Sequence, residues 1–197
     1  MREKILDIAE ELVQSRGLDN VTFQEIADGV GLRKPSLFHH VKNKEELVSL
    51  LIDRCSNKHG PLYDAIIAKD ISAPQKLKEL ASLFEEGLKT GRSCLLAAIS
   101  QSQQSLAEPT REQLEQTANE AVARFAAVFV QGRKEETLAF KGKPLHAAMS
   151  FLAMLQGLQS LCQIDRGQID RGQIHNDTES FKRAVKVFID SLESSKS

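Results

Sequence analysis

Two short helices joined by a tight turn are predicted for residues 21–44, which read VTFQEIADGVGLRKPSLFHHVKNK. Thr22 followed by Glu25 is the pattern of a capping box, in which each side chain accepts a hydrogen bond from the other residue's backbone N–H at a helix start. Gly31 then supplies a residue that tolerates the backbone of a sharp turn. The segment therefore predicts a pair of adjacent helices, and the second helix has an unusual composition.

A proline begins the second helix of this pair. Pro35 fits the first helical position, where its missing N–H costs nothing, and it pushes Lys34 out of helical dihedrals. Leu37 and Val41, four residues apart, share one face of this helix. We expect that face to point inward and to hold the helix on its neighbours.

The rest of the chain also shows helical periodicity. Residues 2–16 carry apolar side chains at helical spacing, and Gly17 is placed to end that helix. Asn43 with Glu46 predicts the cap of a helix over residues 44–67. Further helices are predicted over residues 73–91, 94–105, 109–133, 144–162 and 177–194, the last with a cap at Asn176 and Glu179. No strand pattern is found, so the chain is predicted to be all-α with about nine helices.

Positive charge is concentrated in one short segment. The 197-residue chain has a net charge of −1, so it is not a polycation that coats nucleic acid indiscriminately. The basic residues between positions 33 and 44 are Arg33, Lys34, Lys42 and Lys44, with two histidines and no acid among them. Any one of them alone could belong to a solvated bundle helix. Together with the helix N-terminus they predict DNA contact, with Lys34 and Ser36 able to reach base edges.

Cysteine content and hydropathy indicate a cytoplasmic protein. The three cysteines are far apart and lack CxxC spacing, which argues against a disulfide framework or a zinc site. No apolar run approaches the roughly 20 residues of a membrane span. The charged N-terminal helix does not resemble a signal peptide. We expect no metal, no cofactor and no membrane association.

Residues Gly17 to Leu47, GLDNVTFQEIADGVGLRKPSLFHHVKNKEEL, resemble the helix-turn-helix of the TetR (tetracycline-repressor) family of bacterial transcription regulators. The rest of the chain resembles the family only in being all-helical and of suitable length. The resemblance implies a DNA-binding domain over residues 1–48, with its motif at about residues 22–41 and the fourth helix, 44–67, as connector. Residues 68–197 are then the effector-binding and dimerisation domain.

The same resemblance implies roles for individual residues in DNA binding. Thr22 starts the supporting helix beside a phosphate, Gln24 faces the groove, and Lys44 binds phosphate. In full, the implied DNA-binding residues are Thr22, Gln24, Arg33, Lys34, Pro35, Ser36, Phe38, His39, His40 and Lys44. Phe38 departs from the family, which usually has a phosphate-bonding tyrosine there, so we expect it only to pack. A metal site at His39 and His40 lacks a third ligand within the motif.

Members of this family bind DNA as homodimers. The helix over residues 144–162 is apolar on almost every side, so its own domain and something else must cover it. With the helix over residues 177–194 it is expected to form the dimer interface, and the operator should be a near-palindromic duplex.

The resemblance also implies a small-molecule effector that releases DNA. Candidates for its pocket are Phe84, Leu88, Phe125, Phe129, His146 and Met149, which are expected to lie on inward faces, and Cys94; core packing is the alternative role for most of them.

Other interpretations stay open. An enzyme is argued against because no catalytic triad, phosphate-binding glycine loop or paired carboxylates are found. A helical adaptor that binds proteins would need no basic helix end. A thiol-based sensor of electrophiles or oxidants could use Cys94, because a helix N-terminus favours the reactive thiolate. The tandem repeat QIDRG at residues 163–172 predicts a duplicated surface loop or, alternatively, an interface arm.

Overall fold

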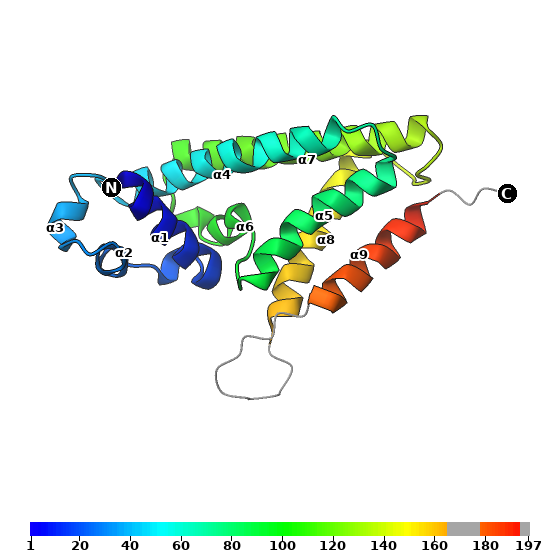
Figure 1. The fold of residues 1–197 in the computed structure, drawn as a ribbon. Coiled ribbons are helices and arrows are strands. Elements are labelled where there is room, and N and C mark those ends of the chain that lie inside the picture. Colours follow the sequence, from blue (N-terminus) through cyan, green and yellow to red (C-terminus); the bar gives the residue numbers. More distant parts are fainter. Residues whose placement is uncertain (165–177, 194–197) are drawn as a thin grey trace. The chain divides into compact units, whose positions relative to one another are not determined.

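The computed structural model describes residues 1–164 and 178–193. They form nine α-helices and two short 3₁₀ turns (Figure 1), and the only β pairing among them is an isolated bridge between Leu138 and Glu193. The elements are α1 (Arg2–Arg16), η1 (Leu18–Asn20), α2 (Phe23–Gly29), α3 (Lys34–Leu37), α4 (Lys44–Ile67), α5 (Ala73–Lys89), α6 (Leu95–Ser100), η2 (Gln103–Ser105), α7 (Glu108–Lys134), α8 (Pro144–Gln163) and α9 (Thr178–Leu192). The predicted all-α fold is confirmed. Most of the tandem repeat and the predicted cap at Asn176 lie outside the described residues.

The chain divides into two compact units. The first joins Met1–His59 to Cys94–Ala118, and the second joins Gly60–Ser93 to Asn119–Ser197. The first unit is larger than the predicted domain over residues 1–48, because a stretch that follows α5 in sequence also belongs to it. The assignment of DNA binding and effector binding to separate domains remains a prediction.

The first helix begins and ends where its sequence predicts. Its buried side chains, Ile5, Leu6, Ala9 and Val13 among them, form one stripe. Gly17 follows with a φ of 81°, a conformation that a residue with a Cβ avoids. Its N–H donates to the carbonyl of Val13 at 2.8 Å. The glycine therefore ends α1 and turns the chain into η1.

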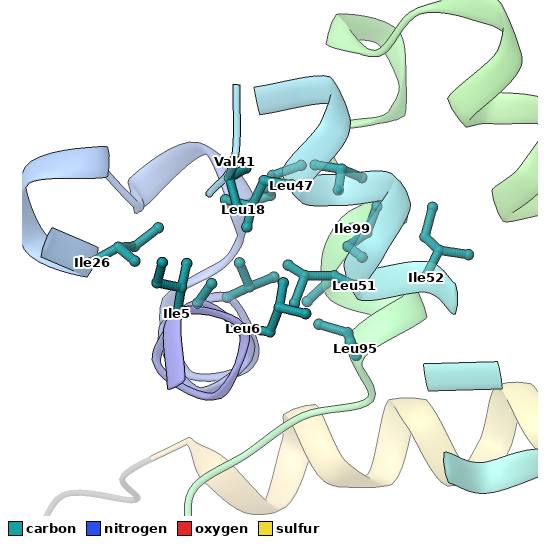
Figure 2. Close-up of a cluster of buried hydrophobic side chains, with 14 of the residues drawn as sticks. Ile5, Leu6, Leu18, Ile26, Val41, Leu47, Leu51, Ile52, Leu95 and Ile99 are labelled. Atoms are coloured by element: carbon teal, nitrogen blue, oxygen red, sulfur yellow. The ribbon is translucent and has the colours of Figure 1, made fainter. Parts of the chain in front are cut away.

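One hydrophobic cluster holds the first unit together. Side chains from α1, α2, α4 and α6 converge in it, as Ile5, Ile26, Leu51 and Leu95 show in Figure 2. Burying an aliphatic side chain of this size contributes about 1.5–3 kcal/mol. The second stretch of this unit supplies part of the cluster through Leu95, Ala98, Ile99, Leu106 and Leu114. The stretch over residues 94–118 is thus part of the core that supports the N-terminal helices.

The predicted single helix over residues 94–105 is wrong. α6 ends at Ser100, and η2 follows as a separate turn. Serine hydroxyls explain the break, because they compete with backbone groups for hydrogen bonds. The hydroxyls of Ser100 and Ser105 each donate to a carbonyl three residues earlier, at 2.8 and 2.9 Å, and the Ser102 hydroxyl binds Asp19 of η1.

Aromatic rings pack together in the second unit. The ring centroid of Phe151 in α8 lies 6.2 Å from that of Phe125 and 6.1 Å from that of Phe129, both in α7. It lies 5.7 Å from that of Phe188 in α9. Pairs at such separations contribute about 0.5–1.5 kcal/mol each beyond simple burial. α5, α8 and α9 also pack against one another (Figure 1).

Gly132 of α7 has no room for a side chain. A Cβ there would lie 2.9 Å from the Cβ of Ala73 and still closer to the side chain of Leu138. We expect Gly132→Ala to lower the free energy of unfolding by about 1–3 kcal/mol through overpacking, as measured by chemical denaturation. In a Leu138→Ala background the same change should cost less. An equal loss in both backgrounds would contradict the steric explanation.

Candidate nucleic-acid interface

A capping box begins α2, as the sequence predicts. The backbone N–H of Thr22 donates to Glu25 Oε2 at 2.9 Å, and that of Glu25 donates to Thr22 Oγ1 at 3.2 Å. The bonds from the backbone and hydroxyl of Thr22, and then that from Arg16, hold the pKa of Glu25 below its ordinary value. The carboxylate is therefore charged at neutral pH, and it fixes the start of α2.

Two backbone hydrogen bonds close the turn after α2. The N–H of Gly31, whose φ is 70°, donates to the carbonyl of Asp28 at 3.1 Å. The N–H of Leu32 donates to the carbonyl of Ala27 at 2.8 Å. This pair of bonds is the Schellman arrangement, which favours glycine at the position of positive φ. It ends α2 and leads the chain directly into α3.

The helix after this turn begins one residue earlier than predicted. α3 spans Lys34–Leu37 with Arg33 as its N-cap, so Pro35 occupies the second helical position. The proline still costs no hydrogen bond, because the first N–H groups of a helix have no partner within it. The expectation that Lys34 lies outside the helix is wrong. The preference at a residue before proline is a bias only, and Arg33 adopts the extended conformation instead (φ −78°, ψ 141°).

Leu37 and Val41 fasten this segment to the first unit. Both side chains are fully buried in its hydrophobic cluster, as predicted. The N–H of Val41 donates to the carbonyl of Leu37 at 3.1 Å. His39 and His40 lie between them in a turn, not at the end of a longer helix. Attachment on both sides of this turn determines which side chains face solvent.

The basic side chains of this segment reach solvent. The exposed residues are Arg33, Lys34, Pro35, Phe38, His39 and Lys42, and the partly exposed ones are Ser36, His40 and Lys44. No Asp or Glu occurs over residues 33–44. The segment therefore offers cationic donors with no carboxylate of its own, which suits phosphate oxygens and base-edge acceptors.

Gln24 and Phe38, like Thr22, have partners within the protein. Gln24 Nε2 donates to Asp28 Oδ1 at 2.7 Å, one turn along α2. Phe38 is 39% exposed, and its ring packs against that of Phe23 with centroids 5.1 Å apart. Such packing is what the lack of a tyrosine hydroxyl led us to expect at Phe38.

Lys44, at the start of α4, has a carboxylate partner. Its Nζ donates to Asp19 Oδ1 at 3.0 Å, and the Ser102 hydroxyl donates to Asp19 Oδ2 at 2.6 Å. The bond from Ser102 and, second, that from Lys44 hold the pKa of Asp19 below its ordinary value. Sequence reasoning missed both Asp19 and Ser102. Asp19 lies 25 residues from Lys44 in the sequence, and Ser102 lies 83 residues from Asp19. No local pattern relates residues so far apart.

Asn43 caps α4 as predicted, but Glu46 does not complete the expected box. Asn43 Oδ1 accepts from the N–H of Glu46 at 2.9 Å. The Glu46 carboxylate accepts from the N–H of Lys42 at 2.6 Å. The start of α4 and the end of the basic segment are therefore tied together.

The predicted effector-pocket residues fall into three groups. Phe84, Leu88, Phe125 and Phe129 are buried within the second unit. Cys94 is the N-cap of α6 and belongs to the first unit. His146 and Met149 are exposed, so the prediction that they face inward is wrong.

The rotation of α8 about its own axis explains this error. Because residues 144–162 are apolar almost all round, their sequence does not determine which face packs inward. The buried face consists of Ala148, Phe151, Leu155, Gln159 and Cys162. Gln159 Nε2 donates to the carbonyl of Phe84 in α5 at 2.8 Å. This polar contact, which periodicity cannot show, fixes the face together with the phenylalanine packing.

The thiol of Cys55 is buried in the first unit. Burial and, second, the neighbouring Cys94 raise the pKa of the Cys55 thiol to about 12, so Cys55 is protonated at neutral pH. Among the described residues, no group of three His, Cys, Asp or Glu side chains is placed to hold a metal ion. In the same residues, no helix has the length and apolar character needed to cross a membrane.

These features define an all-helical protein whose N-terminal helix-turn-helix presents a basic segment to solvent. Residues 5–51 match the model of a family described as bacterial regulatory proteins, tetR family. The helical architecture of the remaining residues agrees with this match. The N-terminal part of the chain therefore carries the helix-turn-helix of the tetR family.

Relatives and solved structures extend the comparison. The chain is 30% identical to the HTH-type transcriptional repressor KstR2 of Rhodococcus jostii over 94 residues, 48% of this chain and 46% of that protein. It thus spans less than half the length of this curated relative. It resembles a TetR-family regulator from Agrobacterium tumefaciens with a TM-score of 0.85 and 19% identity, over 98% of this chain and 97% of that one. The crystal structure of AibR with isovaleryl coenzyme A and operator DNA gives a TM-score of 0.72 and 20% identity, over 98% and 97%. These two likenesses concern the fold.

Thr22→Ala removes the side chain that caps α2. We expect the free energy of unfolding to fall by about 0.5–2 kcal/mol, the usual cost of losing a threonine N-cap. Thermal or chemical denaturation of the full chain measures the change. Thr117→Ala, within α7, is the matched control and should not destabilise, because alanine is the better helix former. A Thr22→Ala variant as stable as the parent would show that the cap contributes nothing.

Proposed function

We propose that this chain represses transcription by binding a near-palindromic DNA operator as a homodimer, and that a small-molecule effector releases it. The observation that carries the proposal is the exposed basic segment over residues 33–44, which contains no acid and is fastened to the core by Leu37 and Val41. The match of residues 5–51 to a family of bacterial regulatory proteins supports it.

In the proposed complex, α3 enters the major groove of the operator. Lys34 donates to guanine O6 and N7, and Ser36 donates to or accepts from a base edge. Lys44 and the exposed start of α2 at Thr22 contact backbone phosphates, which position the protein but carry no sequence information. Gln24 reaches the groove by releasing its bond to Asp28.

The proposed dimer forms through α8 and α9. Both helices carry exposed large apolar side chains, namely Leu145, Met149, Leu161 and Val187. Burial of apolar surface contributes about 25 cal/mol per Å². At Gly157 of α8 a Cβ would meet open space, so a second helix can approach closely there. Two-fold symmetry then presents two copies of α3 to half-sites about 34 Å apart, or a modest multiple of that distance.

The proposed effector binds in the second unit. AibR, which shares the fold, binds isovaleryl coenzyme A and operator DNA in its crystal structure. In this chain, the buried candidates for contact with the proposed effector are Phe84, Leu88, Phe125 and Phe129. All four are apolar, so an effector with an apolar part fits them best. A coupling of about 1–3 kcal/mol, or roughly 5–150-fold in operator affinity, suffices for release.

The test of DNA binding uses the full chain and a duplex that it selects from a random-sequence library. Lys44→Ala should weaken binding to selected and random duplexes alike. Lys34→Ala and Ser36→Ala should reduce the preference for the selected duplex by about 1–3 kcal/mol. Fluorescence anisotropy measures both affinities. Lys141→Ala, at an exposed lysine of the second unit, is the control and should change neither.

Salt dependence gives a second readout for the same variants. Affinity should fall by roughly 10³–10⁵ between about 50 and 200 mM salt for about six to ten phosphate contacts. Failure to select any duplex, or a flat salt response, would contradict the proposal. A helical adaptor, the alternative function, would keep its protein partner after Lys34→Ala and Ser36→Ala.

Leu161→Glu places a charge in the proposed dimer interface. We expect this variant to be monomeric, because burying an unpaired carboxylate is strongly unfavourable. Val130→Glu is the matched control, since Val130 lies on α7 and both parent side chains are 53% exposed. Analytical ultracentrifugation measures the association. A monomeric parent chain, or equal effects of the two substitutions, would rule out this interface.

A further inference from the structure

The carboxylate of Asp19 is hydrogen-bonded to Lys44, the lysine that the proposed function assigns to a DNA phosphate. Asp19 Oδ1 accepts from Lys44 Nζ at 3.0 Å, and Asp19 Oδ2 accepts from the Ser102 hydroxyl at 2.6 Å. Both oxygens of Asp19 therefore have a donor from another part of the chain. All three residues belong to the first unit.

The pair lies where an approaching polyanion can reach it. Asp19 belongs to η1, which leads into Thr22 and α2, and Lys44 directly follows the end of the basic segment. The side chains of Asp19 and Lys44 are 60% and 43% exposed. An anion that binds the ammonium group of Lys44 therefore also meets the carboxylate of Asp19.

We propose that Asp19 competes with a DNA backbone phosphate for the ammonium group of Lys44, and that Ser102 holds Asp19 in the competing position. The inference rests on the proposed function, because it takes Lys44 to be a phosphate ligand. Asp19 is then a further residue of the DNA-binding site, and its effect is to lower affinity.

Two effects of Asp19 act in the same direction. Its negative charge repels a phosphate, and its hydrogen bond occupies one of the three donors of the Lys44 ammonium group. Because both side chains are exposed, water and salt screen the pair, and such pairs change an equilibrium constant by at most about 5-fold. The competition therefore weakens binding without abolishing it, and its effect is largest at low salt.

Ser102 links this competition to the second stretch of the first unit. It follows α6 within Cys94–Ala118, and the chain on either side of that stretch belongs to the second unit. Ser102 is buried, and its bond to Asp19 is shorter than the bond from Lys44. A displacement of this stretch therefore acts on Asp19 directly.

Asp19→Asn tests the proposal, because it removes the charge and keeps a side chain that Ser102 can bond. Affinity should rise by up to about 5-fold for each Lys44, or up to about 25-fold for a dimer, on selected and random duplexes alike. The salt dependence should become steeper. Glu112→Gln, an exposed position on α7 in the same unit, is the control for net charge and should change affinity by less than about 2-fold.

A double-mutant cycle separates competition for Lys44 from general repulsion. In a Lys44→Ala background, Asp19→Asn should tighten binding much less, because no ammonium group is left to release. Ser102→Ala should tighten binding in the parent chain and change nothing in the Asp19→Asn background. Thermal melting checks that each variant is folded, and Asp19→Ala replaces Asp19→Asn if the latter is not.

The outcomes distinguish this inference from the proposed function. Unchanged or looser binding by Asp19→Asn would overturn the competition, as would an equal gain in the Lys44→Ala background. The proposed function survives these results if the parent chain binds its selected duplex and Lys44→Ala weakens that binding. If the parent chain binds no duplex, both proposals fail.

Discussion

The burial of Leu37 and Val41 is the interaction on which the candidate interface depends. α3 spans only Lys34–Leu37, and isolated helices shorter than about 12–15 residues are marginal in water. Its position therefore comes from these two fully buried side chains on either side of the histidine turn. Each contributes about 1.5–3 kcal/mol by burial. With that face inward, Arg33, Lys34 and Lys42 are exposed to solvent, whereas Lys44 is partly exposed and bonds Asp19.

The scaffold beneath this segment includes residues far away in the sequence. Glu45, in the first turn of α4, accepts hydrogen bonds from the Ala107 N–H at 3.1 Å and the Thr110 hydroxyl at 2.7 Å. Gln113 Nε2 donates to Asp53 Oδ1 at 2.7 Å. The start of α7 therefore holds α4 in place, in addition to the N-terminal helices. Ser102 belongs to the same stretch, so the contact with Asp19 is one part of a broader attachment.

Local patterns predicted those parts of the structure that depend on neighbouring residues. The capping box at Thr22 and the glycine that ends α1 involve groups within a few positions, so spacing determines them. The candidate DNA-contact residues could be named because residues 17–47, which contain them all, resemble a known helix-turn-helix. The break after α6 could not be predicted from local patterns, because Ser102 bonds a residue 83 positions away. Nor does an all-round apolar sequence determine which face of α8 packs, so His146 was expected inward and is exposed.

Hydroxyl-radical footprinting of the full chain on its selected duplex would show directly whether two copies of α3 contact two related half-sites. We predict two protected patches on one face of the duplex, related by two-fold symmetry and separated by about 34 Å or a modest multiple of it. A single patch, or protection without symmetry, would contradict a dimer that reads DNA through this segment.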